Sequence, residues 1–151
     1  MSSPIAIRPA TREDIPRVFE LVCELAQFER ERHQVETTPE ILERDGFGES
    51  PLFGLIVAQE QSEVVGMALY YFRYSTWKGK RLYLEDLIVT EKARGRGVGK
   101  ALLEATIQVA RDLNCTGLMW QVLDWNTEAM EFYKRFGVCL DGEWVNVHLD
   151  V

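Results

Sequence analysis

The sequence predicts an α/β protein built on one mixed, mostly antiparallel sheet with helices on its faces. Two observations carry this prediction. Residues 53–74 hold two apolar stretches separated by the polar Gln61-Ser62-Glu63, which is typical of an antiparallel hairpin. Residues 83–123 then follow the order strand, helix, strand, and a crossover of this kind requires a parallel strand pair within the sheet.

The elements before the hairpin follow from short signals. Residues 5–9 begin with alternating apolar side chains and end in a proline, which predicts a short strand. Residues 11–28 open with Thr and Asp at capping-box spacing and continue with apolar side chains at helical spacing, so we expect an amphipathic helix. Thr38-Pro39 predicts a second helix, to about Arg44. Asp45-Gly46-Phe47-Gly48 then predicts a turn.

The second half of the chain alternates strands and helices. Residues 83–89 are mostly apolar, so we expect this strand in the middle of the sheet. Asp141-Gly142 predicts the turn of a closing hairpin. The expected elements are strands at 53–60, 64–74, 83–89 and 118–123, helices at 98–113 and 127–136, and a hairpin at 138–151.

Length and composition predict a single globular domain spanning residues 1–151. The chain has 151 residues, of which 46% are hydrophobic and 27% charged, which is ordinary for a folded domain of this size. It carries 24 acidic against 17 basic residues and a formal net charge of −7. Because nucleic-acid binding needs a basic face, this balance argues against such a partner and favours a cationic ligand.

The cysteines and histidines indicate a reduced compartment and no metal site. Cys23, Cys115 and Cys139 are an odd set without CxxC spacing, and His33 and His148 lie far apart. No apolar run approaches the ~20 residues of a membrane helix, and we find no signal peptide. We therefore expect a cytoplasmic protein with no membrane partner.

A glycine-rich loop stands between the expected strand 83–89 and the helix that follows. Arg94-Gly95-Arg96-Gly97-Val98-Gly99, followed by Lys100, places glycines and positive charges before the free amides of a helix start, which favours a phosphate ligand. The spacing is neither that of a dinucleotide site nor that of a Walker loop. The alternative is a plain turn whose arginines serve solubility.

Glu85 and Asp86 are adjacent carboxylates inside an apolar strand. Neighbouring strand residues face opposite sides, so regular geometry cannot place both on one polar surface. Either an internal Arg or Lys pairs with an acid, or a bulge turns one of them toward a cavity. The functional interpretation is an amine site, in which one carboxylate binds the substrate ammonium and the other helps to remove its proton.

Arg94-x-x-Gly97-x-Gly99 resembles the pyrophosphate-binding motif of the GNAT family of N-acetyltransferases, which hold acetyl-CoA, and the predicted mixed sheet resembles that family's fold. Residues 23–29, 45–53, 70–86 and 123–137 resemble the diamine (spermidine/spermine) acetyltransferases. The stretches YSTWKGK and VLDWNTEAM are closer still to relatives that acetylate thialysine.

The resemblance implies direct transfer of an acetyl group from acetyl-CoA to a primary amine. Glu85 aligns with the family's catalytic glutamate, and Tyr133 would protonate the departing thiolate. The resemblance implies amine binding for Phe28 and Glu29. Glu85 and Asp86 are the carboxylates of the amine site described above, and Trp77 either forms a wall of that site or covers the hairpin tip. Acetyl-CoA binding is implied for the backbone of Leu87, Ile88 and Val89, for Arg94, Gly95, Arg96, Gly97, Val98, Gly99 and Lys100, and for Asn126 and Tyr133.

One departure bears on the substrate. Ser75 stands where the polyamine enzymes of this family carry an aspartate, so we expect short, amino-acid-like amines such as thialysine to be preferred over long polyamines. The resemblance also implies a homodimer. Two alternatives are a non-catalytic CoA-sensing module, which needs neither Glu85 nor Tyr133, and an acetyltransferase of protein or peptide amines. Asn126 is equally suited to cap the helix after it.

Overall fold

The structure is a computed structural model that describes residues 3–151. It divides into two compact units, one ending at Trp120 and the other spanning residues 121–151. The first unit holds a five-stranded sheet in the order β1-β2-β3-β4-β5. Its strands are β1 (Ile5–Pro9), β2 (Gly54–Glu60), β3 (Glu63–Ser75), β4 (Gly79–Val89) and β5 (Leu118–Trp120).

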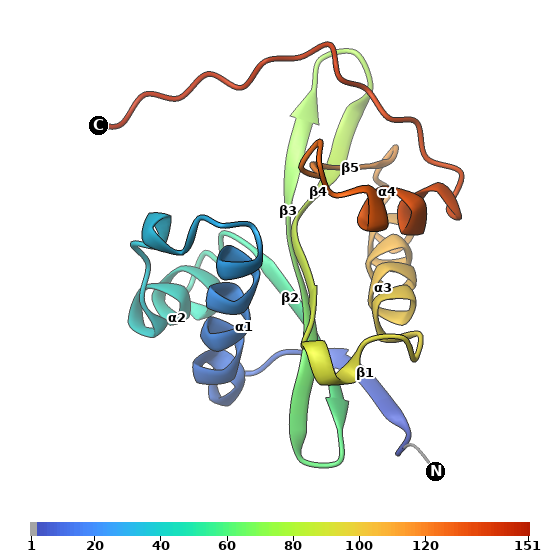
Figure 1. Cartoon of the computed structure of the whole chain (residues 1–151). Helices are drawn as coiled ribbons and strands as arrows, with labels where there is room; N and C mark the ends of the chain where they lie inside the picture. Colours follow the sequence, from blue (N-terminus) through green and yellow to red (C-terminus); the bar gives the residue numbers. More distant parts are fainter. Residues whose placement is uncertain (1–2) are drawn as a thin grey trace. The chain divides into compact units, whose positions relative to one another are not determined.

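The sheet has the mixed topology predicted from the sequence. Strands β1 to β4 pair antiparallel, and β4 pairs with β5 in parallel. Helix α3 (Val98–Asp112) makes the crossover between β4 and β5. Helices α1 (Ile15–Phe28) and α2 (Pro39–Phe47) lie on one side of the sheet and α3 on the other (Figure 1). The fold class is therefore confirmed.

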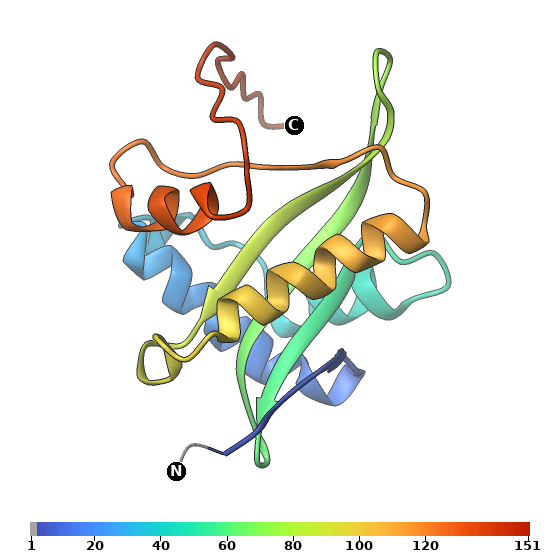
Figure 2. The same ribbon diagram turned by 90° about the vertical axis from the view of Figure 1, so that its right-hand side faces the viewer.

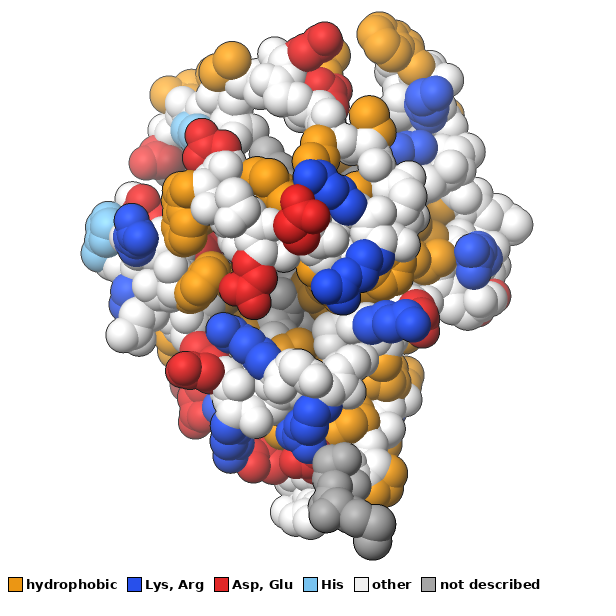
Figure 3. Space-filling view, turned by 45° about the vertical axis from the view of Figure 1, so that its right-hand side comes forward, with side chains coloured by type: hydrophobic (Ala, Val, Ile, Leu, Met, Phe, Trp, Pro, Cys, Tyr) orange, Lys and Arg blue, Asp and Glu red, His pale blue; other side chains and the backbone are white. Residues whose placement is uncertain are grey.

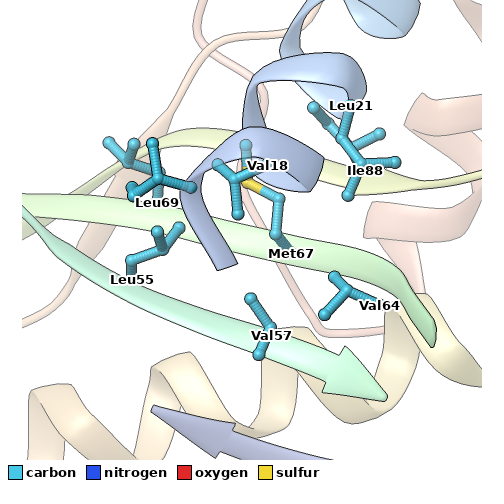
Figure 4. Close-up of a cluster of buried hydrophobic side chains, with 9 residues drawn as sticks. Val18, Leu21, Leu55, Val57, Val64, Met67, Leu69 and Ile88 are labelled. Carbon is cyan, nitrogen blue, oxygen red and sulfur yellow. The ribbon is translucent and has the colours of Figure 1, made fainter. Parts of the chain in front are cut away.

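The main core lies between α1 and the sheet. Val18 and Leu21 of α1 point down onto side chains of β2, β3 and β4, among them Val57, Met67 and Ile88 (Figure 4). On the opposite face α3 runs diagonally across the strands (Figure 2). It packs closely there because Gly66 has no side chain, and a Cβ at that position would lie 2.9 Å from the Ile88 carbonyl oxygen and 3.0 Å from Leu102 Cδ1.

Helix α2 is longer than predicted. Thr38 Oγ1 accepts a hydrogen bond from the Ile41 amide, which confirms the predicted cap, but the helix continues through Asp45 and Gly46 to Phe47. The expected turn at 45–48 was wrong because Gly46 serves packing here rather than a turn. A Cβ on Gly46 would lie 2.4 Å from the ring of Phe53.

The second unit contains α4 (Thr127–Lys134), which ends two residues before the predicted boundary. The predicted closing hairpin at 138–151 is absent, since these residues form no strand. Glu143 donates its amide hydrogen bond to the Asp141 side chain, and Val145 and Val147 are almost fully exposed. A two-stranded hairpin is marginal without a packed face, and the side chains that would support one find no cover here. β5 is also shorter than predicted, ending at Trp120.

No helix among residues 3–151 has the length and apolarity to cross a membrane. Positive and negative side chains are interspersed over the surface drawn in Figure 3. The acidic net charge therefore does not produce a uniformly acidic face on the side shown.

Candidate active site

A β-bulge in β4 sets the geometry of the two adjacent carboxylates. Leu69 of β3 pairs with Asp86 while Tyr70 pairs with Leu84, so Glu85 is an extra residue without a partner. The extra residue shifts the alternation of side chains along β4 by one. Asp86 consequently shares a face of the sheet with Leu69, which packs under α1. One of the two explanations drawn from the sequence, the bulge, is confirmed.

The exposed Glu85 carboxylate is held by a tyrosine of the neighbouring strand. Tyr71 donates a hydrogen bond of 3.1 Å from its hydroxyl to Glu85 Oε1. Burial, the Glu85 charge and this hydrogen bond raise the pKa of Tyr71 to about 12. Tyr71 therefore keeps its proton at neutral pH and acts as a fixed donor to Glu85.

Asp86 and Glu29, the residue after α1, complete a cluster of three acids. Burial, together with the charges of Glu85 and Glu29, raises the pKa of Asp86 to about 7. Burial and the Glu85 charge raise the pKa of Glu29 as well. Within residues 3–151 no Lys or Arg forms an ion pair with any of the three. The internal ion pair that the sequence left open is thus not formed.

Two tyrosine rings line the sheet beside the acid cluster. The centroids of Tyr71 and Tyr83, which are directly paired across β3 and β4, are 5.2 Å apart. Aromatic faces and carboxylates together attract an alkylammonium group. No group of three or more His, Cys, Asp or Glu among the residues described has an arrangement that would hold a metal ion.

Strands β4 and β5 separate immediately before the acid cluster. Their parallel pairing covers Leu82, Tyr83 and Leu84 and goes no further, whereas β4 continues to Val89. Leu87, Ile88 and Val89 therefore have β3 on one side and no strand on the other. The Val89 carbonyl accepts a hydrogen bond from Arg94, and the main-chain groups of Leu87 and Ile88 on this edge are available to an extended ligand.

The glycine-rich loop presents main-chain donors, as its sequence predicts. Gly95 and Gly97 have φ values of +79° and +80°, and no atom lies within 4 Å of where a Cβ would stand on either. The first hydrogen bond of α3 runs from the Ala101 amide to the Gly97 carbonyl, and no side chain caps the helix. The amides of residues 98–100 are therefore free for an anion.

The charged side chains of this loop differ in their contacts. Arg94 donates 2.9 Å to the Val89 carbonyl and lies 5.8 Å from the ring centroid of Phe28, so it joins the loop to the end of α1. Arg96 forms an ion pair with Glu60, and Lys100 lies 3.8 Å from Glu104. The loop thus fits a diphosphate chiefly through its backbone, with Arg96 already engaged by an acid.

Trp77 lies at the tip of the β3–β4 hairpin and is 86% exposed. Ser75 Oγ accepts hydrogen bonds from the amides of Trp77 and Lys78, at 3.2 and 3.0 Å, so Ser75 stabilises this turn. Glu85 lies six positions along β4 from Gly79, which is about 20 Å of strand. The structure does not bring Trp77 to the acid cluster of the same chain.

Asn126 and Tyr133 belong to the second unit. Asn126 Oδ1 accepts a hydrogen bond of 3.2 Å from the Ala129 amide, which confirms its role as the cap of α4. Tyr133 packs near Phe132, with ring centroids 5.4 Å apart.

Four residues of this face were missed in the sequence. They are Tyr71 and Arg73 on β3, and Arg81 and Tyr83 on β4. Their spacing of two along each strand places them on one face, which is a signal that could have found them. Their cross-strand partners, however, depend on the register of the hairpin.

The acetyltransferase (GNAT) family model matches residues 15–138. A thialysine N-epsilon-acetyltransferase of Bos taurus is 42% identical over 141 residues, which cover 88% of this chain and 83% of the relative. A spermidine/spermine N(1)-acetyltransferase-like protein of Homo sapiens is 37% identical over 138 residues, or 87% of this chain and 20% of that protein.

The structural comparison agrees with the sequence comparison. A crystal structure of an aminoglycoside acetyltransferase from an uncultured soil sample superposes with a TM-score of 0.79 at 19% identity, covering 97% of this chain and 96% of that one. At that identity the likeness shows the fold alone. The family match, the 42% identical relative and the shared fold together establish that the chain is an acetyl-CoA-dependent N-acetyltransferase of the GNAT family.

Proposed function

We propose that the protein transfers the acetyl group of acetyl-CoA directly to the terminal primary amine of a small cationic substrate of the thialysine or diamine type. The observation that carries the proposal is the cluster of Glu29, Glu85 and Asp86, which forms no ion pair with a Lys or Arg of residues 3–151 and lies beside the open edge of β4. The substrate ammonium supplies the missing positive charge. Phe28, next to Glu29 and under Arg94, forms the wall toward the acetyl-CoA side.

The acid cluster also serves the chemistry. An alkylammonium of pKa near 10.4 is neutral in only about one part in 10³ at pH 7, and only the neutral amine attacks a thioester. Glu85 is the proposed base because it is exposed and oriented by Tyr71. Asp86, with a pKa of about 7, binds the ammonium and is able to share its proton.

Acetyl-CoA is the cosubstrate of the family, and the chain offers it two sets of main-chain groups. The amides of residues 98–100 with Arg94 would bind the diphosphate, and the unpaired edge at residues 87–89 would bind the pantetheine arm. Tyr133 is the proposed acid that protonates the thiolate, and Asn126 an additional CoA contact. The family match crosses the boundary at residue 120, which supports one domain made of both units.

We propose further that the enzyme is a cytoplasmic homodimer. The resemblance to diamine acetyltransferases supports dimerisation, and so do the exposed apolar side chains of residues 144–151. Sedimentation equilibrium of the purified chain measures the assembly directly, and a monomer at micromolar concentration would contradict it.

The proposed activity is tested by thiol release from acetyl-CoA with thialysine, lysine, putrescine, spermidine and a peptide amine. We expect release with the small amines and product acetylated at the terminal nitrogen, identified by mass spectrometry. Binding of acetyl-CoA with no release for any amine would indicate a CoA-sensing module. Release with the peptide alone would indicate a protein acetyltransferase.

A further inference from the structure

Two arginines stand directly opposite each other on the face of the sheet that holds the acid cluster. Arg73 of β3 pairs with Arg81 of β4 in the antiparallel ladder. Like charges at such positions repel each other and destabilise a sheet. The chain has a net charge of −7, so acidic groups are abundant in it. An anionic partner would offset the repulsion between the two arginines.

The part of the chain that the structure describes does not supply an anionic partner for these arginines. Among residues 3–151 no carboxylate forms an ion pair with Arg73 or Arg81. Arg73 is exposed and extends across β4, 5.9 Å from the Tyr83 ring centroid and 2.9 Å from Met119 Sδ. Arg81 reaches the Leu118 carbonyl at 3.4 Å. Each of these contacts uses one nitrogen of the guanidinium, and the Arg81 guanidinium also lies against Gly117.

The arginine pair and the acid cluster lie in one row along this face. The row begins with the pair Arg73 and Arg81. The next pair on the same face is Tyr71 and Tyr83, and the bulge with Glu85 follows it. Glu85 lies four positions along β4 from Arg81, or roughly 13 Å. The row therefore has a cationic end, an aromatic middle and an anionic end.

The charges at both ends of the row change the pKa values of the two tyrosines. Burial raises the pKa of Tyr83, the Glu85 charge raises it further, and the Arg73 charge acts in the opposite direction. The pKa of Tyr71 responds to the same two charges, with burial again the largest cause. A ligand that lies along the two rings would thus meet Arg73 at one end and Glu85 at the other.

Resting on the proposed function, we infer that Arg73 and Arg81 bind the α-carboxylate of the amine substrate, so that the enzyme selects amino acids with a terminal amine over diamines and polyamines. In a lysine-like substrate the terminal nitrogen and the carboxylate are about 8 Å apart when extended. The length of the substrate and the length of the arginine side chains together span the distance from the arginines to Glu85. A polyamine would instead place a second ammonium against two guanidinium groups.

Lysine and cadaverine test this inference because they differ only in the α-carboxylate. We expect kcat/KM to be at least about tenfold higher for lysine, and for thialysine in the same way, than for cadaverine. In the double variant Arg73→Gln/Arg81→Gln, kcat/KM for lysine should fall about tenfold while that for cadaverine stays level or rises. The effect should lie mainly in KM for lysine.

The controls separate charge from structure. Arg73→Lys should retain much of the preference for lysine, and Arg111→Gln, which removes an exposed arginine of α3, should leave both substrates unchanged. Equal kcat/KM for lysine and cadaverine in the wild type, or a parallel loss for both in the double variant, would overturn the inference while leaving the acetyltransferase intact. Absence of turnover with every amine would instead refute the proposed function.

Discussion

The Glu85 carboxylate is the side chain on which turnover should depend most steeply. In Glu85→Gln the shape and the contact with Tyr71 persist, but the base is lost. We expect kcat to fall about 100-fold at pH 7. The pH optimum should move upward, because the variant must draw on amine that has already lost its proton in solution. The measurement is kcat against pH from 6 to 10.

Asp86 is predicted to make the free energy of unfolding depend on pH. Its pKa is raised to about 7 from an ordinary value near 4, so the ionised form is disfavoured in the folded protein. The folded state then holds a proton that the unfolded state has released, and stability is lost as pH rises from about 4 to about 7. Asp86→Asn should therefore raise Tm by several degrees at pH 8 and have little effect at pH 4. Scanning calorimetry at both pH values measures it, and an equal shift at both would contradict the assigned pKa.

Tyr133 is predicted to act on the leaving thiolate. Tyr133→Phe keeps the ring and its packing near Phe132 and removes the hydroxyl alone. We expect kcat to fall by about 10- to 100-fold with the Kd for acetyl-CoA changed by less than about threefold. Turnover and isothermal titration provide the two numbers. Comparable damage to both would refute the assignment and leave Tyr133 as a binding residue.

At the scale of elements, the start of α3 depends on backbone that only glycine adopts easily. Gly97 has φ +80° at the cap position, with open space where a Cβ would stand. Gly97→Ala should raise KM for acetyl-CoA about tenfold, because the methyl group intrudes on the ligand and the left-handed backbone is strained. Gly142→Ala is the matched control, since Gly142 has equally open space and no positive φ. A KM unchanged from wild type in Gly97→Ala would argue against main-chain binding at this loop.

Elements with strong periodicity or clear caps were predicted well. α1 ends at Phe28 as expected, and the Thr38 and Asn126 caps form as expected. Predictions failed where a tertiary contact decides the outcome. Gly46 lies inside a helix because the Phe53 ring occupies the adjacent space, which no local signal reports. The segment 138–151 has the alternation and turn residues of a hairpin, but its apolar side chains, such as Val145 and Val147, are exposed.

At the scale of the whole molecule, the candidate site was predictable where its residues share a motif. The glycine-rich loop and the pair of acids are each contiguous in sequence and were found there. Tyr71, Arg73, Arg81 and Tyr83 come from two strands whose register is set by the hairpin turn and a bulge. These four side chains come together only when the sheet is assembled, so charge and composition alone did not predict their proximity.

The overall charge of −7 makes a further prediction for binding. A divalent cation such as cadaverine is attracted to the whole protein, whereas lysine carries a net charge of only +1. Raising NaCl from about 0.05 to about 0.5 M should therefore raise KM for cadaverine more than KM for lysine. Steady-state kinetics over a salt series measures both, and identical salt dependence would mean that recognition is confined to short-range contacts.

The single unpaired residue in β4 means that this enzyme's chemistry is sensitive to length as well as to sequence. Deleting Glu85 would turn the bulge into a regular ladder, because Leu84 and Asp86 would become neighbours and keep their partners Tyr70 and Leu69 on opposite faces of the sheet. An in-frame loss of that one codon would thus remove the proposed base while the pairing of β3 with β4 is kept, so a loss of turnover would be assigned to the site and not to the sheet.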